Sequence, residues 1–411
     1  MNRILGLTFS ILFIFLLLSC SKDNNPVNEP LPDQTDGRIT VVNDEMKLNA
    51  RVTVKNDLVA VDTLPGLRKG IGALAFSMTL VAEIAPPVVN GQTLMATAVS
   101  LDGQFAYVSY NLRGETYGGG VDIVQLKGTQ NATIRSEALF NDTKVSSAFF
   151  DNSASRLYLA EASNNPTFDY PAAVEMMTAS GNKLSLTGTV RRVLTSYVAT
   201  SIISVGGSVY ATTGNTGGLY TLTTDSLKVV RMTPLADVRW VDYNLSSSTL
   251  AAVQGGGKLF VITPATGLQG ATYSFTGTGI PESKSTVQVI GGKALVAAGD
   301  GGVKLINISN GNLVGSISRT IVAGLDPSLS VTNAAAASGR YIYISNGEAG
   351  VYVAQASQTL EDKTGDTPIT LTVLGKLRFA NQQSVNHVAF DGSTLVIASG
   401  LGGVKVVTVN F

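Results

Sequence analysis

The sequence predicts an all-β fold, a seven-bladed β-propeller made of four-stranded antiparallel blades. Three observations lead to this prediction: a repeat of about 47 residues, short segments rich in Val, Ile, Tyr and Thr, and the near absence of helical periodicity. Repeats of about 40 to 50 residues with several short strands each are typical of propeller blades. An eight-bladed ring is the alternative.

Each repeat contains two short apolar segments. The first segments are FAYVS (105–109), RLYLA (156–160), SVYAT (208–212), TLAAV (249–253), ALVAA (294–298), YIYIS (341–345) and TLVIA (394–398). The second segments are GGVDIVQL (119–126), AAVEMMTA (172–179), GGLYTLTT (217–224), GKLFVIT (257–263), GGVKLINI (301–308), AGVYVAQA (349–356) and GGVKVVTV (402–409). Glycine pairs suit tight turns that need positive φ. Because the runs lack a clear polar face, we expect strands buried between neighbouring blades.

The last repeat is one strand short. The fifth repeat has four predicted strands, whereas the seventh has three before the chain reaches Phe411. SMTLVAEI (77–84), directly before the first blade, is expected to supply the missing strand. Such a closure joins the two ends of the chain and removes an exposed sheet edge.

Residues 38–76 form a separate N-terminal β segment in this prediction. They contain a candidate hairpin, ARVTVKNDLVAVDT (50–63), with its turn at Asn56–Asp57. This hairpin either decorates the ring or supplies an eighth, partial blade. The predicted organisation is therefore a signal peptide at 1–19, a tether at 20–37, the β segment at 38–76 and the propeller at 77–411.

The N-terminus has the layout of a secretory signal: Arg3, a mostly apolar run over 4–18, and then the only cysteine, Cys20. The run is shorter than the roughly 20 residues that a membrane-spanning helix needs. Leu17-Leu18-Ser19-Cys20 resembles a bacterial lipobox. The resemblance implies that Cys20 becomes the first residue of the mature chain and anchors it to a membrane through attached lipid. With no second cysteine, an intramolecular disulfide is excluded.

The charge balance excludes one class of partner. Without residues 1–19 the chain has 28 basic and 29 acidic side chains, counting from 29 of each with Arg3 removed. A near-neutral chain has no electrostatic footprint for nucleic acid. The composition, 44% hydrophobic and 14% charged, favours a large core over a disordered chain.

Two stretches resemble repeats of known surface proteins. GGVKLINISN (301–310) and YISNGEAGVYVAQAS (343–357) resemble the LVIVD repeat of bacterial and archaeal surface proteins. AYVSYN (106–111) resembles the YVTN repeat of related surface-layer propellers. The resemblance implies a seven-bladed cell-surface lipoprotein and no particular reaction, because one fold hosts many functions.

The tether gives an expected location. SKDNNPVNEPLPDQTDG (21–37) is polar and contains proline, as expected of an extended linker. Ser21, rather than Asp, follows Cys20, and a Lys-Asp pair comes next, as in outer-membrane lipoproteins that include surface-exposed ones. We therefore expect an exported outer-membrane lipoprotein, exposed at the cell surface or facing inward.

Catalytic residue types are scarce. A Ser-His-Asp triad or a His/Cys zinc site would have to use the single histidine, His387, which we expect in the first strand of blade seven, facing the channel, as a structural residue. One tryptophan, Trp240, excludes the tryptophan-bearing repeats of sialidases and quinone-dependent dehydrogenases. No carboxylate recurs at a fixed blade position. The sequence therefore predicts no catalytic residue, no metal and no cofactor.

Two neighbouring repeats carry insertions between their second and third strands. These are YNLRGETYGG (110–119) and EASNNPTFDYP (161–171), on the same face of adjacent blades. Loops on a rigid scaffold often carry function, and aromatic residues and arginine are enriched in binding hot spots. The candidate interaction surface consists of Tyr110, Arg113, Tyr117, Phe168 and Tyr170.

The leading functional hypothesis is a non-catalytic protein-interaction or scaffold module, bound to a membrane by its lipid and to another envelope protein by this surface. A glycan-binding protein of a nutrient-uptake system is the second hypothesis. The third is a lyase or lactonase with a channel metal held by oxygen ligands.

Overall fold

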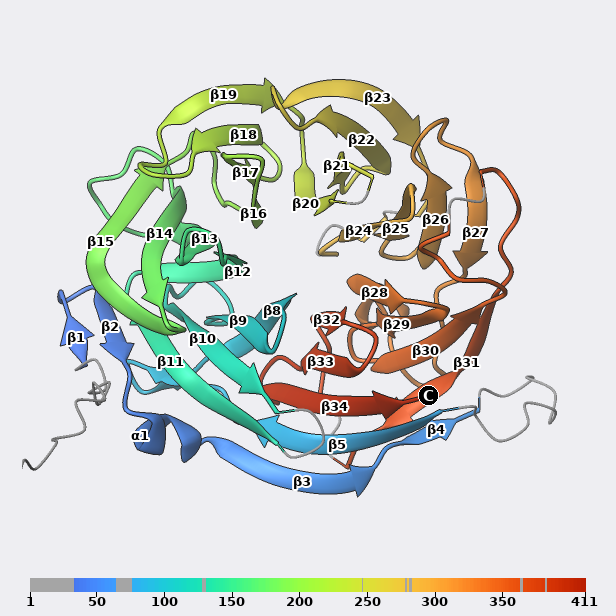
Figure 1. Ribbon diagram of the computed structural model, residues 1–411, viewed down its shortest axis with the longest axis horizontal. Coiled ribbons are helices and arrows are strands. Elements are labelled where there is room, and N and C mark those ends of the chain that lie inside the picture. Colours follow the sequence, from blue (N-terminus) through green and yellow to red (C-terminus); the bar gives the residue numbers. More distant parts are fainter. Residues whose placement is uncertain are drawn as a thin grey trace, which may run out of the picture. The chain divides into compact units, whose positions relative to one another are not determined.

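The computed structural model describes residues 33–63, 76–127, 131–245, 247–277, 279–280, 283–362, 365–380 and 383–411. They belong to one compact unit, a ring of seven antiparallel sheets (Figure 1). The fold is therefore the predicted seven-bladed β-propeller, and no eighth blade is present among the described residues. The predicted signal peptide, Cys20 and the tether up to residue 32 lie outside them.

The first strand of each blade lies nearest the centre of the ring. From the centre outward, the strands are β8 (Met95–Asp102), β9 (Phe105–Asn111), β10 (Gly119–Leu126) and β11 (Ala132–Phe140) in blade 1; β12 (Thr143–Asp151), β13 (Arg156–Ser163), β14 (Ala172–Ser180) and β15 (Lys183–Val193) in blade 2; β16 (Ser201–Val205), β17 (Ser208–Thr212), β18 (Gly218–Thr223) and β19 (Val229–Pro234) in blade 3; and β20 (Val238–Asn244), β21 (Thr249–Gln254), β22 (Lys258–Thr263) and β23 (Leu268–Ser274) in blade 4.

The remaining three blades follow the same order. They are β24 (Val287–Ile290), β25 (Lys293–Ala297), β26 (Val303–Asn307) and β27 (Leu313–Ile317) in blade 5; β28 (Ala334–Ser338), β29 (Tyr341–Ser345), β30 (Val351–Ala356) and β31 (Leu371–Arg378) in blade 6; and β32 (His387–Phe390), β33 (Thr394–Ala398), β34 (Val404–Asn410) and β5 (Ser77–Ile84) in blade 7. Short elements outside this pattern are β6 (Val88–Val89), β7 (Gln92–Thr93) and the 3₁₀ turn Pro327–Leu329.

The two predicted apolar segments of each repeat are the second and third strands of its blade. Every residue of β25 and of β33 is buried, because these strands pack between the sheets on either side. This accounts for the absence of a polar face in their sequences. The core consists of these interfaces between blades, filled mainly by Val, Ile, Leu and Ala.

Blade 7 joins the two ends of the chain, as predicted. β5 pairs antiparallel with β34, from Val404 opposite Ile84 to Asn410 opposite Ser77. Gly403 makes this close approach because its φ is +70° and a Cβ there would lie 2.0 Å from the carbonyl oxygen of Ile84. At the other end of the pair, the rings of Phe76, Tyr341 and Phe411 pack together, with centroids 4.6 to 5.7 Å apart.

Residues 33–63, here called the N-terminal strap, run along the outer edges of three consecutive blades (Figure 1). β1 (Gln34–Thr35) pairs with β2 (Ile39–Val42), and β2 pairs with β11 of blade 1. The helix α1 (Glu45–Asn49) follows, capped by Asp44. β3 (Val52–Leu58) then pairs with β5 of blade 7, and β4 (Ala60–Asp62) with β31 of blade 6.

The predicted hairpin at 50–63 is wrong. β3 continues through Asn56 and Asp57, with a bulge between Val54 and Asp57 instead of a turn. A two-stranded hairpin is marginally stable in isolation, whereas β3 and β4 each extend a larger sheet and cover its edge. The segment therefore decorates the ring as two separate edge strands.

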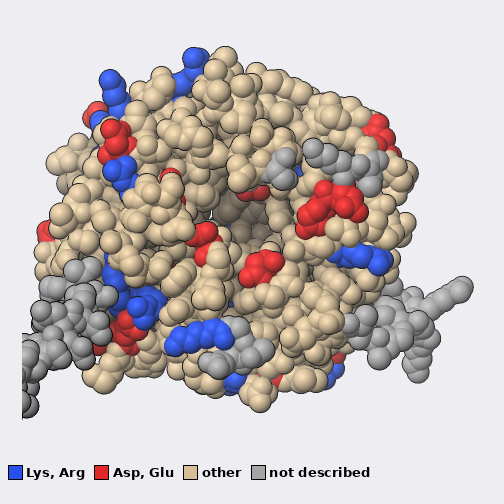
Figure 2. All heavy atoms as spheres, viewed as in Figure 1, with Lys and Arg blue, Asp and Glu red and all other residues tan. Residues whose placement is uncertain are grey.

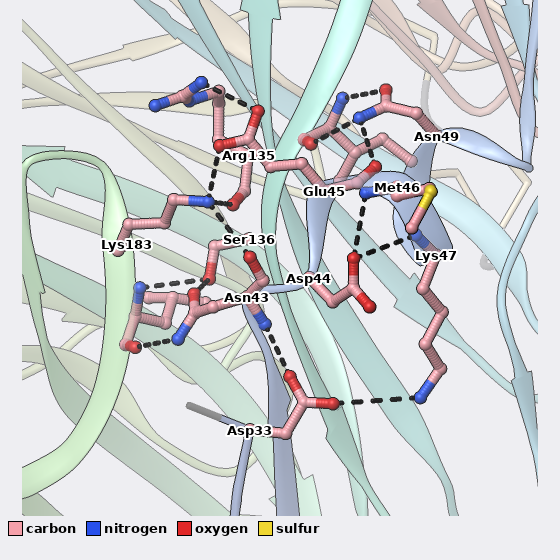
Figure 3. A network of polar contacts seen from close by, with 12 residues as sticks. Asp33, Asn43, Asp44, Glu45, Met46, Lys47, Asn49, Arg135, Ser136 and Lys183 are labelled. Atoms are coloured by element: carbon pink, nitrogen blue, oxygen red, sulfur yellow. Dashed lines mark hydrogen bonds and ion pairs between the residues drawn. The ribbon is translucent and has the colours of Figure 1, made fainter. Parts of the chain in front are cut away.

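Polar contacts fix the strap to blades 1 and 2 (Figure 3). Lys183 of β15 donates from Nζ to the Asn43 carbonyl at 3.1 Å and to Glu45 Oε1 at 2.7 Å. Asn43 is fully buried, and its side chain accepts from Ser136 Oγ at 2.6 Å and donates to the carbonyl of Leu184 at 3.1 Å. The strap thus bridges the outer strands of two blades.

Two arginines of the strap enter buried acidic sites. Arg51 Nη2 lies 2.8 Å from Asp122 Oδ1 and 2.7 Å from Glu137 Oε2, and Asp122 also accepts from the Tyr110 hydroxyl at 2.8 Å. Burial alone would lower the pKa of Arg51, but these two carboxylates raise it above its usual value. Arg38 makes a bidentate pair with fully buried Glu175, at 2.7 and 2.8 Å.

We expect Arg51→Met to lower the free energy of unfolding by about 3 to 5 kcal/mol, because it leaves two buried carboxylates without their partner. Arg378→Met is the matched control: Arg378 joins blade 6 to Asp62 of the strap by a solvent-exposed pair, and exposed pairs contribute little. Urea unfolding of both variants tests this. Equal losses of stability would contradict the assigned role of Arg51.

Candidate functional site

One face of the propeller carries the connections between second and third strands, and it is called the loop face below. The connections of blades 1 and 2 span residues 112–118 and 164–171. Those of the other blades are shorter, at 213–217, 255–257, 298–302, 346–350 and 399–403. The predicted insertions are therefore present and adjacent, and they are longer than the other connections between second and third strands.

Tyr110 does not belong to this surface. It lies in β9, its side chain is fully buried, and its hydroxyl donates to Asp122. Its sequence position at the start of an insertion suggested a loop residue, but β9 continues to Asn111 and directs Tyr110 into the core. Tyr110 is part of the Arg51 cluster instead.

The blade 1 loop is held by a lysine of blade 2. Lys144 Nζ donates to the carbonyl of Gly114 and lies 5.3 Å from the ring centroid of Tyr117. A cation over an aromatic ring is attracted by its π-face. Tyr117 is half-buried, and Arg113 of the same loop is exposed.

The blade 2 loop rests on an arginine of its own blade. Arg191 lies with its guanidinium carbon 5.0 Å from the ring centroid of half-buried Phe168. Tyr170 is 44% exposed, which makes it the most accessible aromatic side chain of the predicted set. Arg113, Tyr117, Phe168 and Tyr170 thus come from two adjacent loops.

Below the blade 2 loop lies a buried acidic pair. Arg191 Nε is 3.5 Å from Glu161 Oε2 and 3.6 Å from Glu175 Oε2, and both glutamates are fully buried. Burial, and then the charge of Glu175, raise the pKa of Glu161 well above its usual value. The positive charges of Arg191 and Arg38 act in the opposite direction and lower the pKa of Glu161. No local pattern in the sequence pointed to Lys144 or Arg191, because each contacts a loop that is distant from it in the chain.

The channel contains the single histidine, where it was expected. His387 begins β32 and is buried, and its ring stacks on that of Trp240 from β20, with centroids 5.1 Å apart and planes inclined by 29°. Blades 4 and 7 thus contact each other across the channel. Burial, with a smaller contribution from Lys284, lowers the pKa of His387 to about 3, so the imidazole is neutral at physiological pH.

The channel and its mouth contain two adjoining cavities. The inner one, about 400 Å³, is lined by residues of all seven first strands. The outer one, about 600 Å³, is lined by residues that precede first strands, such as Thr200 and Lys284, and by Gly214 and Asn215 of a loop-face connection. It therefore opens on the loop face. Seen down the ring axis, the centre is hollow, with acidic side chains near the opening (Figure 2).

Within the described residues, no group of three or more His, Cys, Asp or Glu side chains is arranged to hold a metal ion. In the same part of the chain, no helix has the length and apolar character needed to cross a membrane.

The sequence matches no protein-family model and no curated protein. The predicted resemblance to LVIVD-repeat proteins therefore stays a prediction. Solved structures resemble the chain in fold. U3-55K has a TM-score of 0.55 and 11% identity, and the match covers 79% of this chain and 98% of that protein. The RRP9 WD40 repeats have a TM-score of 0.55 and 11% identity, and the match covers 80% of this chain and 100% of theirs. BamB from Moraxella catarrhalis has a TM-score of 0.50 and 14% identity, and the match covers 81% of this chain and 100% of BamB. At these identities the likeness is one of fold alone.

The neutral histidine predicts a pH dependence of stability. The folded state keeps His387 unprotonated down to a pKa of about 3, whereas the unfolded chain takes up a proton near pH 6.5. Between these two pH values the unfolded state binds more protons than the folded state. The contribution of neutral His387 to the free energy of unfolding is therefore complete above pH 6.5 and is lost as the pH falls.

We therefore expect the loss of stability between pH 7.5 and 5.5 to be smaller in His387→Gln than in the wild type, by about 1 kcal/mol. Urea unfolding at the two pH values gives this difference, and other titrating groups cancel in the comparison. The same pH response in both proteins would contradict a neutral, buried His387.

Proposed function

We propose that this protein is a non-catalytic interaction module of the bacterial envelope, which binds another envelope protein through the loop surface of blades 1 and 2. The loop surface is defined as Arg113, Tyr117, Phe168 and Tyr170. The observation that carries the proposal is the fixed arrangement of the two longest connections between second and third strands, each held by a cation from blade 2.

The composition of the loop surface supports binding. Arginine and tyrosine contribute disproportionately to protein interfaces, because they offer large contact areas together with hydrogen-bonding groups. Tyr117 and Phe168 are already ordered by Lys144 and Arg191. Less conformational entropy is therefore lost on binding than for free side chains. Propellers in general commonly serve as interaction scaffolds.

The proposed location follows from the sequence. A lipid on Cys20 would tether the chain to the outer membrane, and the polar segment 21–32 would separate the lipid from the ring, since residues 33–37 of the predicted tether belong to the strap. Our proposal places the ring at the cell surface. Such an anchor would keep the loop surface near other envelope proteins and raise their effective concentration.

The experiment is affinity capture from detergent-solubilised envelopes, quantified by mass spectrometry. We expect the double variant Arg113→Ala, Tyr170→Ala to capture its partner at least about tenfold less than the wild type, as for loss of a hot spot. Leu401→Ala is the matched control, because Leu401 is 50% exposed on the blade 7 connection of the same face.

Equal capture by the double variant and the wild type would contradict the proposal. Loss of binding to purified envelope glycans in the double variant, with protein capture unchanged, would favour the glycan hypothesis instead.

A further inference from the structure

The channel mouth holds a lysine, Lys284, with no carboxylate partner among the described residues. Lys284 precedes β24, and no carboxylate among the described residues lies within ion-pair distance of its Nζ. Its neighbour Arg239 differs, because its guanidinium makes two 2.9 Å bonds to Asp237 and is neutralised. Lys284 therefore supplies the net positive charge of the outer cavity.

The position of Lys284 is fixed by its surroundings. Its Nζ lies 5.6 Å from the ring centroid of Trp240, and its backbone N–H donates to Asn333 Oδ1 at 3.2 Å. Burial lowers the pKa of Lys284 to about 8, so the charged ammonium form still predominates at neutral pH. A partly desolvated ammonium favours an anionic ligand, since a nearby negative charge offsets its burial.

The inner cavity has a complementary character. Three of the residues that line it carry a buried polar atom without a hydrogen-bond partner among the described residues: Ser147 Oγ, Thr286 Oγ1 and His387 Nδ1. Buried polar groups are normally satisfied, and each unsatisfied one costs about 1 to 3 kcal/mol. A ligand hydroxyl group that reached these atoms would supply the missing hydrogen-bond partner.

The two cavities meet at one level of the channel. Trp240 lines both of them, and the consecutive residues Ser146 and Ser147 line one each. A small molecule that extended past the Trp240 ring would therefore reach both sets of groups.

The charges orient such a molecule. Asp242 borders the inner cavity and accepts from the backbone N–H of Val289 at 2.7 Å. An anionic group would be repelled by the carboxylate of Asp242 and attracted by Lys284. The charged end of the ligand therefore belongs in the outer cavity and its neutral, hydroxylated end in the inner one.

We propose that the channel mouth binds a small hydroxylated monocarboxylate, with its carboxylate on Lys284 and its hydroxyl groups toward Ser147, Thr286 and His387. A free sugar acid and the acidic end of a glycan share this chemistry. The site is separate from the loop surface, and it does not depend on the proposed protein partner.

The single tryptophan makes the site directly observable. Sodium gluconate and sodium glucuronate are titrated into the full-length protein while the emission of Trp240 is followed, with calorimetry on the same samples. Glucose and matched sodium chloride serve as the neutral and ionic controls, and a glucuronate-terminated oligosaccharide distinguishes a glycan end from a free acid.

We expect saturable binding of at least one of the two carboxylates, and none of glucose or chloride. Lys284→Gln should weaken it at least about tenfold, as for loss of one charge-assisted contact. Lys284→Arg should retain it, and Lys228→Gln, at an exposed position on blade 3, should leave it unchanged.

Lys284→Gln should fold, because removing an unpaired, partly buried charge relieves a cost of desolvation. The absence of saturable heat and emission change with both carboxylates would overturn the proposal. So would equal affinity in Lys284→Gln, or binding of glucose as tight as that of gluconate.

Discussion

The pairing of β5 with β34 is the interaction on which the rest of the structure depends. In each of the other blades, the four strands are consecutive in the chain, so each can form from local segments. Blade 7 needs residues 77–84 and 404–410 to meet, and until they do the ring has two open edges. The strap then covers the outer edge of β5 with β3, which leaves the closing strand between two partners.

The buried charges of the strap serve this closure. Arg51 lies directly before β3 and is held by carboxylates of blade 1, so it ties the strand that covers blade 7 to the neighbouring blade. Arg38 extends the attachment to blade 2 through Glu175. A buried ion pair adds little net stability compared with an apolar contact, but removing one partner is costly. Such pairs are therefore suited to holding the strap in one position on the ring. With no disulfide among the described residues, packing and these pairs maintain the ring.

A closed ring gives the two proposed sites their geometry. The loop surface depends on blades 1 and 2 keeping their spacing, because Lys144 of one blade binds the loop of the other. The channel site depends on blades 4 and 7 facing each other, since Trp240 and His387 stack between them. Both arrangements would be lost if the ring opened between blades 7 and 1.

The sequence predicts the features that recur within each repeat and misses those that depend on contacts between distant segments. The second and third strands, the closing strand at 77–84 and the channel position of His387 follow from the period and from apolar runs. The separate positions of β3 and β4 do not, because they are determined by the free edges of β5 and β31. The burial of Tyr110 depends on how far β9 continues, and the stacking of Trp240 on His387 joins residues from two blades.

Hydrogen exchange followed by mass spectrometry tests the closure most directly. Our account predicts that amides of residues 78–84 exchange as slowly as those of 404–410 and much more slowly than those of the loop at 112–118, since β5 is paired on both sides and the loop is not. Exchange of residues 78–84 at the rate of that loop, with 404–410 equally unprotected, would contradict a ring closed by its N-terminal strand.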